Sequence, residues 1–407
     1  MLDSQYLVKQ FKNPYFNTIV FELQETEEIA GCMKLIVDPH HRTGYVRGFM
    51  VRPKYMGKID ASIMCMMLHE WAELKQGSEF DLVYSEIRTV HPKSQAVCLK
   101  SGYRPAAFFA NKDVFKGDRE TDILIIDLKQ KALEMRNPEV KLIPQAMELF
   151  NHQTTIYEGM LQYEFARLYT KRYYGSVMDY QDAFDKISVK EEADKYGYIS
   201  FSFSLGTATL TGLYTPMVGA IEKIEYSYST LEEFEVLMAY LRNYYMEKDA
   251  QHCEVFASAY IPEEQAILDN LGFSVVGYAV AWRSISEELR EDAVVFALFS
   301  QPPDKDEMDL SPECERFYQC VYSKPDESEM EKIKQSFLDL YTNGLERDSA
   351  EIAGYALQNI AELFKLKKNY SKAIIYLKEA SDLYAKCDTI KAKRCFYEAE
   401  RLKLLKL

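Results

Sequence analysis

A short loop around Gly57 carries the residue types that bind phosphate groups. Positive charge beside it comes from Arg52, Lys54 and Lys58, and a helix is expected directly after the loop. Amides at a helix N-terminus point outward and a glycine lets a ligand approach the main chain, so this combination favours an anion such as a diphosphate. Ile59 opposes close approach because its side chain is β-branched, although the three cations could offset this. The alternative is that these cations only solvate a surface turn.

Glu86 is the side chain best suited to proton transfer. It lies in a predicted strand over residues 81–89, and alternation places Tyr84 and Arg88 on the same face. A carboxylate half-buried in a cleft has a raised pKa, as a general base that works near neutral pH requires. The alternative is an ion pair between Glu86 and Arg88, or between Glu86 and a neighbouring strand.

Alternating strand and helix patterns position these residues. Apolar residues with a period of two predict strands, and apolar residues at helical spacing predict helices. The first part of the chain therefore reads as strands at 16–23, 29–37, 44–51, 81–89, 104–109 and 121–128, with helices at 61–74 and 92–101. This order predicts a mixed α/β sheet.

Residues 138–285 are predicted to repeat this plan. Strands are expected at 141–143, 198–203, 207–214, 220–228 and 253–259, with helices within 145–174 and at 231–245 and 262–271. The junction before the helix at 231 has no glycine, and Thr230 or Ser229 is suited to be its N-cap, so this junction would not hold phosphate. A group of tyrosines near the start of the repeat suits a ligand pocket, a protein contact or core packing: Tyr157, Tyr163, Tyr169, Tyr173, Tyr174 and Tyr180.

The C-terminal part is predicted to be helical. Proline and acidic residues make 301–325 a linker, and 326–407 follow as about five helices. One helical pair resembles a tetratricopeptide repeat, with Asn369 and Tyr370 at its turn, and small residues at Ala361 and Ala373 let its two helices approach closely. The residues at the expected positions of the motif are Leu357, Ile360, Ala361, Phe364, Ala373, Leu377 and Ala380. This region could bind a partner protein or pack on the rest of the chain.

Two segments together resemble the GNAT superfamily of acyl-CoA-dependent N-acyltransferases. One is the loop, on which the family's phosphate-binding pattern falls at Met56, Ile59 and Ala61, with only Ala61 matching fully. The other is residues 90–105, a helix that ends in Gly102-Tyr103. The glycine is expected in a left-handed C-terminal cap. The family's opening strand and helices are reduced here, because only about 15 residues precede the first clear strand.

The resemblance implies two tandem domains, 1–130 and 131–300, of which the second lacks the phosphate loop. It also implies acetyl-CoA as co-substrate, with the pantetheine arm held between the strands 44–51 and 81–89. The implied cofactor-binding residues are Met50, Val51, Arg52, Lys54, Met56, Gly57, Lys58, Ile59, Asp60, Ala61 and Ser62. Cys98 stands where the family often places the tyrosine that protonates the leaving thiolate. A thiol could donate that proton, or Cys98 could be a small apolar filler of its helix.

The leading hypothesis is therefore an N-acyltransferase that moves an acetyl group to a small-molecule or peptide amine. Its active site would lie in the first domain, with Glu86 and Cys98 as catalytic groups and the second domain shaping the acceptor pocket. The alternative is a non-catalytic binding or assembly protein that recruits a partner through its helical tail. A third possibility is one composite site formed by both domains.

The composition of the chain limits its possible partners and its cellular compartment. The net charge is −14, and the middle third of the chain holds nearly all of the acidic excess. Such a surface repels nucleic acid and attracts a cationic amine, or it only aids solubility. Eight cysteines without a Cys-x-x-Cys spacing favour reduced thiols over disulfides or a metal site. No apolar run approaches a membrane span and no signal peptide is recognisable, so a cytoplasmic protein without membrane contact is expected.

Overall fold

The computed structural model describes residues 12–76, 80–157, 166–169, 180–322, 327–347, 349–366, 370–388, 391–393, 395–396 and 399. The chain divides into two compact units, with the boundary between Tyr322 and Ser323. The first unit is a mixed α/β structure and the second is all helical, as the sequence predicts.

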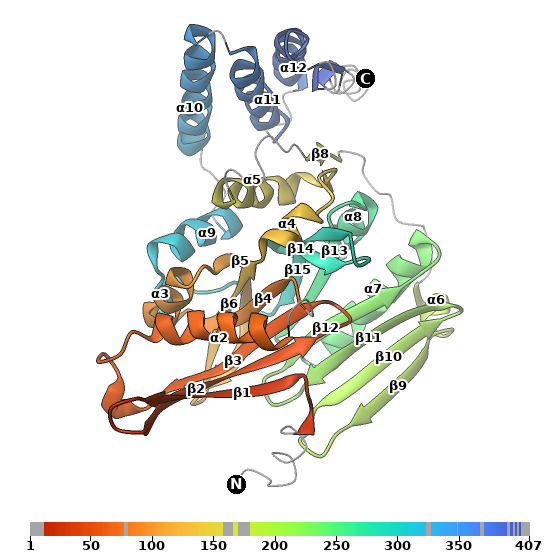
Figure 1. The fold of residues 1–407 in the computed structure, drawn as a ribbon. Helices are drawn as coiled ribbons and strands as arrows, with labels where there is room; N and C mark the ends of the chain where they lie inside the picture. Colours follow the sequence, from red (N-terminus) through yellow and green to blue (C-terminus); the bar gives the residue numbers. More distant parts are fainter. Residues whose placement is uncertain are drawn as a thin grey trace. The chain divides into compact units, whose positions relative to one another are not determined.

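The first half of the first unit contains six strands (Figure 1). In chain order its elements are β1 (Phe16–Leu23), β2 (Glu28–Asp38), β3 (Thr43–Val51), η1 (Pro53–Tyr55), α2 (Ala61–Gln76), β4 (Leu82–Arg88), α3 (Pro92–Lys100), β5 (Arg104–Phe115) and β6 (Asp118–Leu128). The predicted elements are therefore present, with β5 extending six residues beyond the predicted strand that ended at Phe109.

The second half follows the same plan after a short connection. That connection holds α4 (Gln130–Glu134), β7 (Lys141–Leu142), η2 (Pro144–Ala146), α5 (Met147–Ile156), β8 (Arg167–Leu168) and α6 (Tyr180–Phe184). Then come β9 (Ser188–Ala193), β10 (Ile199–Leu205), β11 (Ala208–Thr215), β12 (Ala220–Ser227), α7 (Leu231–Glu247), β13 (His252–Ser258), α8 (Pro262–Asn270), β14 (Ser274–Ser284) and β15 (Arg290–Phe299).

The prediction of helical structure within 145–174 is wrong near its C-terminal end, because the strand β8 lies there and pairs with β7. Of the tyrosine group in this region, Tyr163, Tyr173 and Tyr174 lie outside the described residues.

One continuous sheet joins the two halves. Its strand order is β1-β2-β3-β4-β6-β5-β14-β15-β13-β12-β11-β10-β9, so β5 of one half lies beside β14 of the other. The two strands meet at Gly277 and Ala107. A Cβ atom at Gly277 would lie 2.3 Å from the carbonyl oxygen of Ala106, so only glycine permits this approach.

Matching positions in the two halves show that the second repeats the first. Pro92 and Pro262 each begin a helix, and Gly102 and Gly272 each have a positive φ just after it, at 103° and 87°. A third pair with the same spacing in sequence, Asn111 and Ala281, has φ values of 58° and 50° within a bulge of β5 and β14. Because β5 and β14 are such a corresponding pair and lie side by side, the corresponding strands of the two halves follow in mirrored order on either side of them.

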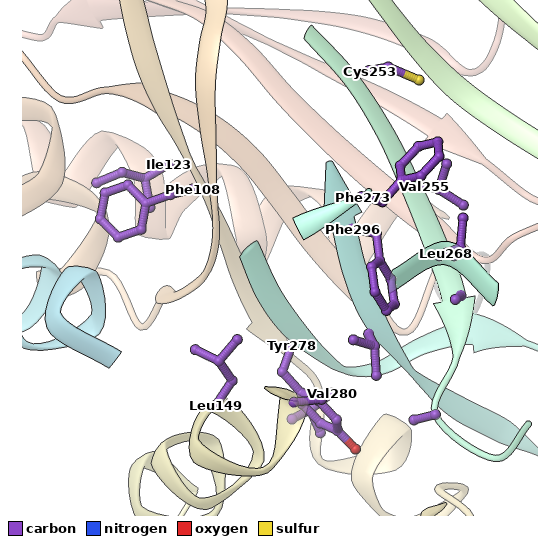
Figure 2. Close-up of a cluster of buried hydrophobic side chains, with 14 of the residues drawn as sticks. Phe108, Ile123, Leu149, Cys253, Val255, Leu268, Phe273, Tyr278, Val280 and Phe296 are labelled. Carbon is purple, nitrogen blue, oxygen red and sulfur yellow. The ribbon is translucent and has the colours of Figure 1, made fainter. Parts of the chain in front are cut away.

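Helices of both halves pack on one face of the sheet. Figure 2 shows part of that core, where Val255, Leu268, Phe273 and Phe296 gather. The opposite face has its own buried cluster, made only of strand residues: Leu82, Ala106, Ala107, Phe109, Leu124, Ile126, Val276, Ala279, Val295 and Ala297. This second face, called the inner face below, also carries Glu86.

The linker predicted at 301–325 contains instead η3 (Lys305–Glu307) and α9 (Pro312–Tyr322). Phe317 of α9 is fully buried and stacks on Phe108, with ring centroids 5.7 Å apart. Proline and acidic residues occur mainly before residue 312, whereas buried side chains recur at helical spacing after it. A prediction from the composition of the whole segment therefore missed the helix. Residues 323–326 lie outside the described part.

The second unit contains α10 (Glu327–Glu346), α11 (Ala350–Leu366) and α12 (Tyr370–Tyr384). Its core includes the residues singled out in the sequence, with Ala361 and Ala373 fully buried between larger side chains. Asn369 and most of the last predicted helix lie outside the described residues, and likeness to a tetratricopeptide repeat stays a prediction. No helix in the described part of the chain is both long and apolar enough to cross a membrane.

The N-cap of α7 offers a direct stability test. Thr230 forms a capping box with Glu233, as the sequence suggested for this position. We expect Thr230→Ala to lower the free energy of unfolding of the first unit by about 0.5–2 kcal/mol, because a helix amide loses its acceptor. Ser229→Ala is the control, since only the main chain of Ser229 is bonded to Glu233. Equal losses in urea unfolding of the two variants would contradict the assignment.

Candidate functional site

The parallel strands β3 and β4 separate after a short paired stretch. They pair at Thr43 with Leu82, Gly44 with Val83 and Tyr45 with Tyr84, and not beyond. Further along, β3 pairs only with β2, and β4 only with β6. Beyond Tyr45 and Tyr84 the facing main-chain groups of the two strands are therefore not paired with each other, at the place where the sequence predicted the pantetheine arm.

The loop after β3 closes largely on itself. The amide of Met56 donates to the carbonyl of Pro53 (3.2 Å), and that of Lys58 donates to the carbonyl of Tyr55 (3.0 Å). Gly57 has a φ of 73°, and a Cβ atom there would meet nothing within 4 Å. Ile59 packs against the hydrophobic core, so its side chain is directed inward. Gly57 is thus exposed, but two neighbouring amides are already bonded.

Asp60 occupies the N-terminus of α2, where the sequence predicted a bound phosphate. Its Oδ1 accepts hydrogen bonds from the amide (3.1 Å) and the hydroxyl (2.6 Å) of Ser62, and its carbonyl accepts the amide of Ile63 (3.1 Å). Lys100 pairs with the same carboxylate. That ammonium and the Ser62 bonds lower the pKa of Asp60 to about 2, so the carboxylate stays charged. The expectation of free amides is therefore not met at Ser62 and Ile63.

The cations of the loop are only partly available. Lys54 and Tyr55 both bond to Glu28 of β2. Arg52 and Lys58 have no ion-pair partner within the described ranges. Of the remaining predicted contacts, Met50 and Val51 pair with Cys32 and Gly31 of β2.

Glu86 belongs to a buried ionic cluster on the inner face. Its Oε1 lies 2.6 Å from Nζ of Lys112, which is also 2.8 Å from Glu254 and 3.5 Å from Glu222. The side chain of Lys112 is only 5% exposed and that of Glu86 19%. Because β4 and β5 belong to the first half, and β12 and β13 to the second, the cluster joins the two halves.

Burial raises the pKa of Glu86 to about 7, and the carboxylates of Glu254 and Glu222 add to this effect, whereas Lys112 opposes it. Burial also favours a higher pKa for Glu254, but the Lys112 ammonium and the hydrogen bond from His252 outweigh this effect. The pKa of Glu254 is therefore lowered. The predicted pKa rise at Glu86 thus occurs together with an ion pair, but the partner Lys112 comes from β5, which β6 separates from β4, and not from a neighbouring strand. Arg88, the other partner considered, bonds to Glu120 instead.

Aromatic rings from both halves lie beside this cluster. Tyr45 stacks on Tyr84 at 4.8 Å, Tyr84 meets Trp282 edge-on at 5.0 Å, and Trp282 stacks on Phe256 at 4.7 Å. Burial raises the pKa of both Tyr45 and Tyr84 above the ordinary value, so both phenols stay protonated.

Cys98 is half-buried in α3 and packs against the core. Burial raises its pKa well above that of an ordinary thiol. The Cys98 thiol is therefore a weaker acid than the CoA thiol. Proton transfer from Cys98 to a leaving CoA thiolate is unfavourable for that reason. The side chain therefore suits the filler role better than the catalytic one.

The two halves differ at the point where their parallel strands separate. In the second half β12 and β13 pair only at two positions, and Glu264 fills the region beyond them. It accepts hydrogen bonds from Tyr226 (2.8 Å), Tyr228 (2.6 Å) and the amide of Ser258 (3.1 Å). The position of the first half that matches Glu264 is Ser94, whose buried hydroxyl has no hydrogen-bond partner among the described residues. The first half therefore has a short side chain at the position where Glu264 bonds both separating strands of the second half.

Sequence reasoning missed Lys112, Glu222, Glu254 and His252. Glu254 did carry a signal, because a carboxylate within the apolar run of β13 requires a partner. Within the described residues, no three side chains of histidine, cysteine, aspartate or glutamate are arranged to hold a metal ion.

Comparison with solved structures finds partial likeness to N-acetyltransferases. A spermidine N-acetyltransferase SpeG chimera from Vibrio cholerae and hSSAT is 15% identical, with a TM-score of 0.29, and the match covers 31% of this chain and 78% of that chain. The Vibrio cholerae spermidine N-acetyltransferase in complex with CoA and spermine is 14% identical, with a TM-score of 0.29 over 31% of this chain and 72% of its own. Likeness of this degree transfers no residue role.

No protein-family model matches the chain, and no curated protein matches its sequence.

Proposed function

We propose that this protein is an acyl-CoA-dependent N-acyltransferase that transfers an acetyl group from acetyl-CoA to an amine. The site lies in the first half, and the second half supplies part of the acceptor side. The observation that carries the proposal is Glu86, a carboxylate with a pKa of about 7 on the strand that diverges from β3. A base with that pKa is half ionised near neutral pH, which suits proton transfer.

The chemistry needs no covalent enzyme intermediate. Glu86 removes a proton from the acceptor ammonium, and the lone pair of the resulting neutral amine attacks the thioester carbon. The nitrogen of the tetrahedral intermediate then loses a second proton to solvent. Collapse of the tetrahedral intermediate breaks the carbon–sulfur bond, the amide forms, and the CoA thiolate takes up a proton from solvent. Unpaired main-chain groups of β3 and β4 hold the pantetheine amides and orient the thioester.

Isothermal titration of the full-length protein with acetyl-CoA tests the proposal directly. We expect saturable heat that free CoA competes away. Absence of heat and of competition at millimolar ligand would remove the enzyme proposal.

Asp60 provides a sharper test, because its charge opposes the diphosphate. We expect Asp60→Asn to tighten CoA binding about fivefold to tenfold, since the amide keeps the cap on Ser62 but removes a negative charge within a few ångströms of the phosphates. Asp118→Asn, an exposed carboxylate at the start of β6, is the matched control. Unchanged or weaker binding in Asp60→Asn would place the diphosphate elsewhere.

The second candidate is a non-catalytic binding protein, and the arrangement at Asp60 favours it. A carboxylate that caps α2 and an ion pair between Lys54 and Glu28 leave a phosphate few free groups. Here the helical tail would recruit a protein partner. Capture of a partner that requires residues 326–407, from a full-length protein that binds no CoA, would support this function.

A further inference from the structure

The junction between the two halves has approximate two-fold symmetry. The strands β5 and β14 are antiparallel and meet at Ala107 and Gly277. These two residues are separated by the same spacing in sequence as the bulge residues Asn111 and Ala281, so they too are matching positions of the repeat. Each contact that one half makes across the junction therefore has a counterpart position in the other half.

Three pairs of inner-face residues match by this spacing. They are Lys112 and Trp282, Glu86 and Phe256, and Glu254 and Tyr84. In the ionic trio, Nζ of Lys112 lies 2.6 Å from Glu86 and 2.8 Å from Glu254. In the aromatic trio, Trp282 stacks on Phe256 at 4.7 Å and meets Tyr84 at 5.0 Å. The same arrangement thus occurs twice, once with charges and once with rings.

The aromatic trio indicates that joining the two halves does not require charge. Its three rings contact the buried apolar cluster of the inner face and connect β4, β13 and β14. A buried ion pair seldom stabilises a fold more than well-packed apolar side chains of similar volume do. Packing of the halves therefore does not account for the charges of the ionic trio, and a role in the chemistry of Glu86 does.

Lys112 divides its charge among three carboxylates. Its Nζ is 3.5 Å from Glu222, besides its closer contacts with Glu86 and Glu254. Burial disfavours the ammonium, but the carboxylates outweigh burial and raise the pKa of Lys112 well above its ordinary value. A carboxylate with such an ammonium to itself would have its pKa lowered by about 1–3 units. Glu86 is buried and receives only part of this charge, and its pKa is about 7.

His252 maintains Glu254 as a competitor for Lys112. The ring is fully buried, and its Nδ1 donates to the carbonyl oxygen of Ala110 (2.9 Å). Its Nε2 lies 3.1 Å from Oε2 of Glu254, the same oxygen that accepts from Lys112. Because the carbonyl can only accept, the contact between Nε2 and Glu254 holds a further proton. This proton and the ammonium favour the anion of Glu254, which therefore competes with Glu86 at neutral pH.

We propose that Lys112, Glu254 and His252 are positioning residues through which the second half sets the proton affinity of Glu86. Glu254 and His252 belong to β13, whereas Glu86 belongs to β4 and Lys112 to β5. Glu86 is thus a base of the required strength only when the two halves are joined. This inference rests on the proposed acyltransferase function for the role of Glu86 as the base.

Other charged and titratable groups also lie around Glu86. Among the described residues they are Glu222 of β12, Asp122 of β6, the ion pair of Arg88 with Glu120, and the phenols of Tyr45 and Tyr84. Burial, together with the charge of Glu86, raises the pKa of Asp122 to about 8. A measurement must therefore separate Glu86 from Asp122.

Nuclear magnetic resonance titration of the full-length protein, labelled only at the glutamate side-chain carboxyl carbons, makes this separation. The signal of Glu86 is the one that Glu86→Gln lacks. We expect Lys112→Met to move the midpoint of this signal up by about 1–3 pH units, because the ammonium is lost. We expect Glu254→Gln to move it down by about one pH unit, because Lys112 then serves Glu86 more fully. Glutamine keeps the shape of Glu254 and can still bond Lys112 and His252.

Glu225→Gln, the same substitution at a largely exposed position of β12, should leave the midpoint unchanged. A general loosening of the structure would move both variants toward the ordinary value of glutamate, so opposite shifts distinguish the proposed role from a merely structural one. Midpoints that stay unchanged, or that move in the same direction, would overturn the inference. If Lys112→Met does not fold, Glu254→Gln still tests it, with a thermal melt to show that this variant is folded.

The titration contains no acetyl-CoA, so its outcome is separate from that of the proposed function. If the midpoints shift as expected but the protein acetylates no amine, the coupling between the halves stands and the proposed function falls. If the protein acetylates an amine but the midpoint of Glu86 is the same in both variants, the proposed function stands and this inference falls.

Discussion

Replacement of Glu86 by glutamine is expected to lower kcat for acetyl transfer by about 10²–10⁴-fold, the usual contribution of a general base. Glutamine has nearly the same shape and can still accept the bond from Lys112. The loss would therefore reflect proton transfer rather than packing. Initial rates with saturating acetyl-CoA and amine, together with a thermal melt of each variant, measure it.

The pH dependence gives a second readout for the same variant. Glu86 is active as its anion, so the wild-type rate should rise with pH and level off above about 7, where the carboxyl group has lost its proton. Glu86→Gln should lose that inflection. Glu225→Gln removes a largely exposed carboxylate from β12 and should keep both rate and inflection. An unchanged inflection in Glu86→Gln would assign the base to another group.

Local signals in the sequence predicted most elements of the first unit. The cap at Thr230 and the glycine turn at Gly102 each depend on a few neighbouring residues, and the structure has them as predicted. The phosphate loop was predicted from Gly57 and the neighbouring cations alone. That interpretation counted Asp60 among the cofactor-binding residues and missed that it is itself a strong N-cap residue, whose carboxylate bonds Ser62.

The partners of Glu86 could not be predicted because they are distant in sequence. Lys112 reaches Glu86 from a bulge in β5, where Asn111 adopts a φ of 58° and breaks the alternation of side chains. Glu222 and Glu254 reach it only because β5 pairs with β14 and the two halves form one sheet. A pattern with a period of two specifies neither a bulge nor the pairing of separate halves.

A buried ion pair between the halves is expected to dominate the stability of the first unit. Arg290 of β15 is fully buried, and its guanidinium lies 3.0 Å from Asp81 and donates to the carbonyl oxygens of Ala281 (2.6 Å) and Trp282 (2.9 Å). Asp81 also accepts two bonds from Arg42, both at 2.7 Å. Asp81→Asn would leave a buried guanidinium without its counter-ion, so we expect a loss of about 3–5 kcal/mol in urea unfolding.

A matched control comes from the exposed pair of Lys305 and Glu315 in the same unit, whose side chains are 40% and 32% exposed. Solvent screens such a pair, so Glu315→Gln should cost no more than about 1 kcal/mol. Losses of similar size in the two variants would mean that Arg290 finds another partner or water.

The same ion pair predicts how an isolated first half behaves. A fragment of residues 1–130 would lack Arg290 and would expose Ala107 and Phe109, which β14 and β15 bury in the intact unit. We expect this fragment to aggregate or to show no cooperative unfolding, because an apolar sheet face and an unpaired strand edge favour association. A fragment that unfolds cooperatively and binds acetyl-CoA would instead show that the first half is self-sufficient, and the site would then need no side chain from the second half.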